Sequence, residues 1–159
     1  MEKKFSSEVP TKVVQSRKGY VLSYNVREAT EEEILAEWKS SGMGVEQGDV
    51  PTGDFVREHR YVYNVVDIPL GQWTYDGIIN AIVRDKYRSD QMEAITNNMA
   101  AINAMFMQVL VTDGIIAATK YLKDSVDEEN SERFREMQEW RVTAKKVANE
   151  VIAYARKKI

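Results

Sequence analysis

The spacing of apolar residues changes near Pro69 and divides the chain into two parts. Before Pro69 the period is two. In residues 19–26, Tyr, Leu, Tyr and Val at even positions alternate with Val, Ser and Asn at odd positions. This alternation is typical of a strand with one buried face. Residues 13–20, which lead into a tight turn, and residues 57–70 predict two more strands, so three strands are expected in all.

A short helix is expected between the second and third of these strands, over residues 29–42. Thr30 and Glu33 have the spacing of a capping box, in which the Thr side chain accepts an amide hydrogen bond and the Glu side chain returns one. Residues 40–54 then carry four glycines and a proline. This composition predicts a long loop.

After Pro69 the period becomes that of a helix. Thr74 is expected to cap a helix over residues 75–87, and Asp90 with Glu93 to cap the next helix. That second helix carries apolar residues at steps of three and four, the spacing of a heptad seam. These residues are Met92, Ile95, Met99, Ile102, Phe106 and Val109.

An interruption follows at Asp113 and Gly114. Because glycine inside a helix costs about 1 kcal/mol relative to alanine, a break or a kink is expected there, with a further helical piece behind it. The last helix is predicted to run from about Asn130 to Lys158. It carries a second seam at the same spacing: Met137, Trp140, Ala144, Val147, Val151 and Tyr154.

These patterns predict an α+β protein. Residues 1–69 are expected to form a small three-stranded antiparallel lobe with a short helix. Residues 70–159 are expected to form a helical bundle lobe of three to four helices with heptad seams.

The central helix has more apolar surface than one seam can hold. Met105 and Met107 lie off the seam, as do Ile115 and Ile116 beyond the interruption. A helix that is apolar on most sides must be covered on most sides, and methionine-rich surfaces suit adaptable partner binding. We therefore expect the bundle to be completed by self-association or by a partner. Antiparallel pairing of the two seams within one chain is the alternative.

Residues 94–119 have one charged residue, Asp113, and are a candidate membrane span. The segment is long enough to cross a bilayer, which needs about 20 apolar residues. Polar side chains are scattered through it, however, and an Asp at the centre of a bilayer costs about 2.5–3.5 kcal/mol. The pattern therefore favours a helix buried in a protein core or in an oligomer.

Composition and motifs argue against several chemistries. The chain has no cysteine, which excludes disulfides and thiolate metal sites, and its net charge of −3 disfavours nucleic-acid binding. His59 has no second histidine near it and is interpreted as an exposed residue at a strand start. The acidic residues around 124–132 are interpreted as the solvent-exposed start of a helix. The glycine-rich segment of residues 40–54 does not contain the lysine that a phosphate-binding loop requires. No catalytic residue, cofactor or metal site is predicted.

Three stretches resemble a known group of proteins. They are the helix start Trp73-Thr74-Tyr75, the pattern Y-x-S-D-x-M-x-A-I-x-N-N over residues 87–98, and M-Q-x-W-R over residues 137–141. In these stretches, which lie within residues 68–98 and 136–152, the sequence resembles small, uncharacterised phage and prophage structural proteins of gut Bacteroidales. The resemblance implies a virion-associated role, at the tail or a tail-fibre attachment or in assembly. It carries over no functional residue.

The expected function is therefore that of a non-enzymatic structural or assembly protein that acts as an oligomer. Its expected partners are other copies of itself and other structural proteins, with no nucleic acid. It would be cytoplasmic during assembly, since residues 1–10 lack a signal peptide, and virion-associated afterwards. The alternatives are a transient tail-assembly chaperone or adaptor, a membrane-active protein, and an enzyme with a site between the lobes. The residues expected in the interface are Met92, Ile95, Met99, Ile102, Met105, Phe106, Met107, Val109, Met137, Trp140, Val147, Val151 and Tyr154.

Overall fold

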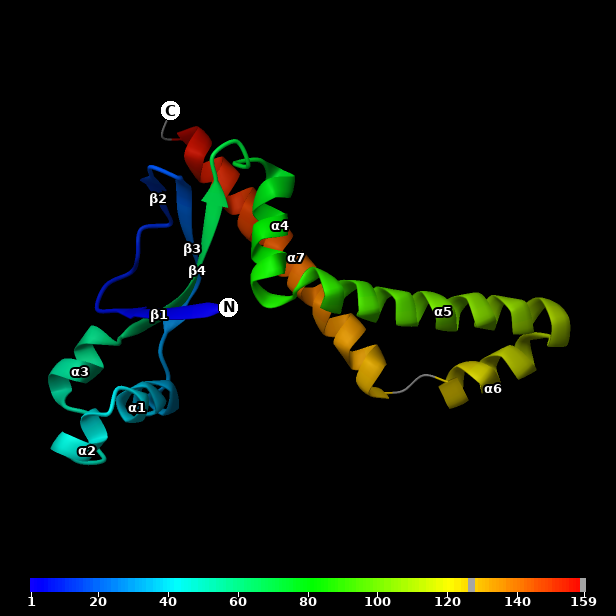
Figure 1. Cartoon of the computed structure of the whole chain (residues 1–159), viewed down its shortest axis with the longest axis horizontal. Coiled ribbons are helices and arrows are strands. Elements are labelled where there is room, and N and C mark those ends of the chain that lie inside the picture. Colours follow the sequence, from blue (N-terminus) through cyan, green and yellow to red (C-terminus); the bar gives the residue numbers. More distant parts are fainter. Residues whose placement is uncertain (126–127, 158–159) are drawn as a thin grey trace.

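The computed structural model describes residues 1–125 and 128–157, and it combines a four-stranded sheet with helices (Figure 1). The predicted α+β class is confirmed. The strands are β1 (Glu2–Ser6), β2 (Val13–Ser16), β3 (Gly19–Glu28) and β4 (Tyr61–Pro69). The helices are α1 (Glu31–Ser40), α2 (Met43–Gln47), α3 (Gly53–Glu58), α4 (Tyr75–Lys86), α5 (Ser89–Asp113), α6 (Ile115–Ser125) and α7 (Glu128–Lys157). Lys158, the predicted end of the last helix, lies outside the described residues.

The sheet has the order β1-β4-β3-β2, and its neighbouring strands are antiparallel. The prediction of three strands missed β1. This strand pairs with β4 from Glu2 opposite Val65 to Ser6 opposite Tyr61. Three of its five residues are charged, so it lacks the apolar alternation that revealed the other strands. A charged strand is well suited to a sheet edge, where it discourages pairing with other chains.

The alternation predicted for the central strand is present over most of its length. Leu22 and Tyr24 are buried on one face of β3, beside buried residues of β4 such as Ile68. The pairing of β3 with β4 then shifts between Tyr24 and Arg27. Asn25 lies at this β-bulge with φ of 53°, a backbone conformation that Asn tolerates better than most residues. The shift interrupts the alternation of buried and exposed residues along β3.

The main core forms where α4 and α7 pack on one face of the sheet (Figure 1). Leu22 and Ile68 from the sheet share this core with Ile78 and Ile82 of α4 and with Trp140 of α7. The Trp140 indole nitrogen also donates a hydrogen bond to the Ile82 carbonyl oxygen, at 3.1 Å. The boundary expected after Pro69 thus falls between elements that share a single core.

A smaller core lies beneath α1 and α3. The capping box predicted for α1 is present: Thr30 accepts a hydrogen bond from the Glu33 amide at 3.3 Å, and the Glu33 carboxylate accepts one from the Thr30 amide at 3.1 Å. The long loop predicted for residues 40–54 is wrong, because α2 and the start of α3 lie within it. Trp38 and Phe55 bury their rings against each other and hold these short helices in place.

The ends of the longer helices follow the predictions in part. Thr74 caps α4, as predicted, by accepting a hydrogen bond from the Gly77 amide. The predicted cap of α5 by Asp90 and Glu93 is wrong. The helix begins at Ser89, so Asp90 already lies in its first turn, and the Gln91 side-chain oxygen accepts a hydrogen bond from the Arg88 amide at 3.0 Å.

Candidate interaction surface

Helices α5 and α6 form a hairpin that projects from the rest of the molecule (Figure 1). The interruption expected near Gly114 is a complete break, since α5 ends at Asp113 and α6 begins at Ile115. Gly114 has φ of 86° and ψ of 178°, a conformation that is essentially restricted to glycine. The chain therefore reverses direction at one residue, and α6 returns along α5.

Buried and half-buried apolar side chains lie along the hairpin. Ile102 of α5 and Ala118 of α6 are both buried. On α6, Ala117, Tyr121 and Leu122 are half-buried and share a helical face with Ala118. The inner side of the hairpin is thus a thin apolar layer, and the outer sides of both helices remain exposed.

The end of the hairpin exposes apolar side chains. The exposed fractions are 45% for Met105, 55% for Met107, 83% for Val111, 62% for Ile115 and 85% for Ile116. Single exposed apolar residues are common on protein surfaces, whereas a larger apolar patch marks a contact site. Val111, Ile115 and Ile116 lie within three residues of the turn at Gly114, and Met105 and Met107 face different sides of α5 because they are two residues apart on the helix. We call these five residues the apolar tip.

Two hydroxyl groups near the apolar tip are satisfied within their own helices. The Thr112 hydroxyl donates to the Gln108 carbonyl oxygen at 2.9 Å, and the Thr119 hydroxyl donates to the Ile115 carbonyl oxygen at 2.7 Å. Removing water from a hydroxyl that already donates a hydrogen bond costs less free energy than removing it from an unpaired hydroxyl. The tip is therefore suited to being covered by an apolar surface.

The first predicted seam follows the inner side of α5. Ile102 is buried, and the other seam residues are half-buried, with Met92 packed against the main core. The half-buried residues are Met92, Ile95, Met99, Phe106 and Val109. Met105 and Met107, which the sequence placed off the seam, are exposed. These two methionines are the members of the predicted interface that the structure leaves open to a partner.

The second predicted seam is used inside the chain. Met137, Trp140 and Val151 are buried, and Val147 and Tyr154 are half-buried. Trp140 and Val151 belong to the main core, and Val147 packs against it. This side of α7 therefore covers the sheet and α4 within the chain. The sequence could not separate these uses, because periodicity shows a buried face without showing what buries it.

Helix α5 is also long and apolar enough to cross a membrane, judged by length and composition alone. Only 6% of its most apolar stretch is buried inside the structure. The sequence favoured a helix enclosed by its own core or by an oligomer. Within the chain, α6 and α7 both contact it, and most of its remaining surface is exposed.

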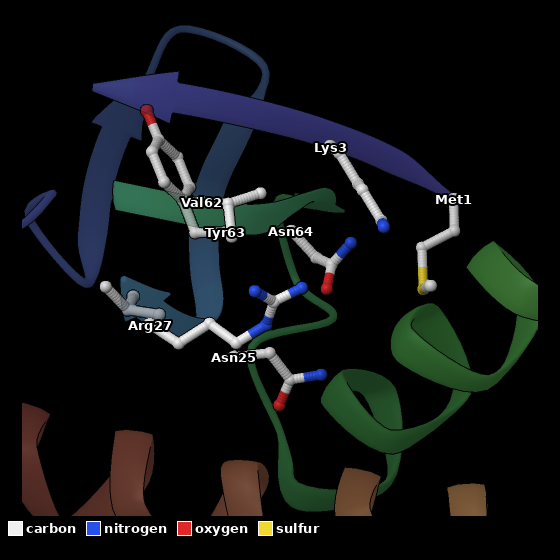
Figure 2. A pocket seen from close by; sticks show the side chains of 8 residues that line it. Met1, Lys3, Asn25, Arg27, Val62, Tyr63 and Asn64 are labelled. Carbon is white, nitrogen blue, oxygen red and sulfur yellow. The ribbon is translucent and has the colours of Figure 1, made fainter. Parts of the chain in front are cut away.

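A pocket of about 410 Å³ opens at the β-bulge (Figure 2). Its polar lining includes Lys3, Arg27, Asn25 and Asn64. The Arg27 guanidinium donates two hydrogen bonds to the Glu33 carboxylate, at 2.8 and 2.5 Å, and Lys3 lies 3.5 Å from the same carboxylate. The Arg27 hydrogen bonds, followed by the one from the Thr30 amide, lower the pKa of Glu33 to about 2. Both basic side chains of the pocket are thus engaged within the chain.

Tyr24 provides the polar contact beside the main core. Its hydroxyl donates to the Asp85 carboxylate at 3.1 Å. Burial of the ring, reinforced by the negative charge of Asp85, raises the pKa of Tyr24 above its usual value. This pair joins β3 to α4 and fixes the helix against the sheet.

His59 does not lie at an exposed strand start, as the sequence suggested. It follows α3 as its C-terminal cap, and its ring is half-buried and stacks on Phe55 with 3.8 Å between ring centroids. Its Nδ1 lies 2.7 Å from the Phe55 carbonyl oxygen. Within residues 1–125 and 128–157, no three His, Asp or Glu side chains are grouped so that they could hold a metal ion. His59 is thus placed as part of the smaller core.

No protein family, curated protein or solved structure matches this chain. The candidate interaction surface therefore rests on the geometry and chemistry of the hairpin.

Proposed function

We propose that the protein is a structural or assembly protein that acts as a homo-oligomer through its α5–α6 hairpin. The observation that carries the proposal is the apolar tip, which projects from the molecule with five exposed apolar residues. The resemblance of the sequence to phage structural proteins supports placing such an oligomer in a virion or tail.

A second copy of the chain is an electrostatically compatible partner. Between Glu93 and Asp113, α5 carries no ionisable side chain. In a two-fold contact each surface meets an identical copy of itself, so a charged surface would bring like charges together. The uncharged length of α5 avoids this repulsion, and Asp113, exposed at the end of the hairpin, is the one charged residue within residues 94–119.

The size of the apolar tip sets the expected strength of association. Full burial of one large apolar side chain contributes about 1.5–3 kcal/mol. Because Met105 and Met107 face different sides of α5, one contact does not bury all five residues of each copy, and the gain is comparable with the cost of association, which is about 4–15 kcal/mol. We expect a reversible oligomer whose population depends on protein concentration.

Sedimentation of the purified protein over a range of concentrations tests the proposal. We expect the wild-type protein to associate at tens of micromolar, and Met107→Glu and Ile116→Glu to shift it to the monomer because each would bury a charge in the contact. Val45→Glu is the matched control, since Val45 is exposed on α2, away from the hairpin. A wild-type protein that stays monomeric, or hairpin variants that associate normally, would overturn the proposal.

Contact with a lipid bilayer is a second candidate function, favoured by the exposure of the apolar stretch of α5. Asn97, Asn98 and Asn103 on the same helix oppose it, because each amide loses hydrogen bonds to water in lipid. Flotation with phospholipid vesicles separates the two functions. Co-flotation that Ile116→Glu abolishes would support the bilayer, and protein that stays at the bottom of the gradient would remove it.

A further inference from the structure

A groove of about 320 Å³ lies between α4 and α7, away from the apolar tip. Its floor is apolar, and its rim combines amides with three cations. Eight residues line it: Ile79, Asn80, Val83 and Arg84 of α4, Met92 of α5, and Gln138, Arg141 and Lys145 of α7. The α7 residues recur at steps of three and four, so they form one stripe along the helix.

The three cations of the groove lack partners within the described part of the chain. Arg84, Arg141 and Lys145 take part in no ion pair there, and Arg84 and Lys145 are exposed. Most other arginines do form ion pairs with carboxylates: Arg27, Arg57, Arg60, Arg88, Arg133 and Arg135. The groove thus gathers positive charge that the fold leaves uncompensated.

The arrangement is unfavourable without an anion. Arg141 and Lys145 are one turn apart on α7, and like charges at this spacing destabilise a helix by about 0.2–0.5 kcal/mol. Arg84 adds a third positive charge from the opposite wall. A bound carboxylate would relieve this repulsion, and the planar guanidinium groups can each hold a carboxylate with two hydrogen bonds.

We propose that the α4–α7 groove binds an acidic helical segment of a partner polypeptide. Glutamates one turn apart on such a helix would be about 6 Å apart, which matches the rise between Arg141 and Lys145. The apolar floor of Ile79, Val83 and Met92 would receive the methylene groups of their side chains. Nucleic acid is a poorer match, because it needs a larger basic surface than three cations on a chain of net charge −3.

Binding of a labelled synthetic peptide tests the proposal. The probe is an alanine-based helical peptide with glutamates four residues apart, followed by fluorescence anisotropy with the full-length protein. We expect the double variant Arg141→Gln/Lys145→Gln to bind about tenfold more weakly or worse, the loss expected for one charge-assisted hydrogen bond. Arg141→Lys should fall between, because it keeps the charge and loses the planar fork.

The controls separate this site from the hairpin and from general charge effects. Arg17→Gln removes an exposed arginine of the turn between β2 and β3 and should bind like wild type. Ile116→Glu should also bind like wild type, so loss of self-association and loss of peptide binding are distinguishable. Equal binding of a peptide with Gln in place of Glu would overturn the proposal. So would unchanged binding by the double variant, or displacement of the peptide by inorganic phosphate or duplex DNA at a concentration equal to that of the peptide.

Discussion

Trp140 shows how one residue connects the parts of the fold. Its ring lies in the main core and faces Tyr24 of the sheet, with 6.2 Å between ring centroids. The Lys86 ammonium group lies 4.7 Å from the centroid of the same ring. Together with the hydrogen bond to Ile82, these contacts make Trp140 the side chain through which α7 meets both α4 and β3.

We expect Trp140→Phe to destabilise the protein by about 1–3 kcal/mol, because it removes a buried hydrogen bond and leaves a small cavity. Urea unfolding followed by circular dichroism measures the change. Val142→Ala is the control, since Val142 lies two residues away on the exposed side of α7, and its effect should stay within about 0.5 kcal/mol. Equal stability of Trp140→Phe and wild type would contradict this role.

The stability of the fold is expected to depend on the protonation of Tyr24 at alkaline pH. Burial and the neighbouring Asp85 raise its pKa in the folded state above the usual value of 10.0. The folded state therefore holds this proton more tightly than the unfolded state. The stability gained is complete below pH 10 and decreases as the pH rises above 10.

Unfolding free energies measured at a series of pH values around and above 10 test this expectation. Wild type should lose stability over this range more steeply than Tyr24→Phe, which has no proton to release at this position. Parallel curves for the two proteins would show that the Tyr24 hydroxyl does not titrate differently on folding.

At the scale of elements, Gly114 determines the shape of the hairpin. We expect Gly114→Ala to destabilise the turn by on the order of 1–3 kcal/mol, because a side chain there is forced into a conformation reserved for glycine. Hydrogen exchange of the α6 amides should then become faster. Gly53→Ala is the matched control: its backbone is outside the glycine region, and a Cβ would meet open space. Unchanged exchange in α6 would contradict the expectation.

The elements with strong local signals could be predicted from the sequence. Strand β3 and helix α4 were identified because a buried face repeats with the period of each structure and Thr74 caps the helix. Strand β1 has no such signal, since its stability comes from backbone pairing with β4, which lies far away in the chain. Helices α2 and α3 were missed because Trp38 and Phe55, not local propensity, hold them.

The residues predicted to form the interface fall into two groups in the structure, one covered within the chain and one exposed. Both seams show the same 3-4 spacing, and Ile102 of the first and Met137 of the second are buried within the chain. Met105 and Met107, which lie off the first seam, are exposed on the hairpin. Periodicity identifies the covered side of a helix, and the identity of the covering surface depends on the tertiary arrangement. The α4–α7 groove was not predicted for the same reason. Its cations come from helices more than fifty residues apart, and no local motif joins Arg84 to Arg141.

At the scale of the whole molecule, the hairpin separates the sheet from the apolar tip by the length of a helix. The 25 residues of α5 extend roughly 37 Å at 1.5 Å per residue. If two copies meet at their tips, the number of residues in α5 determines the distance between the two sheets. Removing seven residues from α5, with a matching shortening of α6, would draw each sheet about 10 Å closer to the contact. The repeat distance of an ordered array would then change in discrete steps while the contact itself stayed the same.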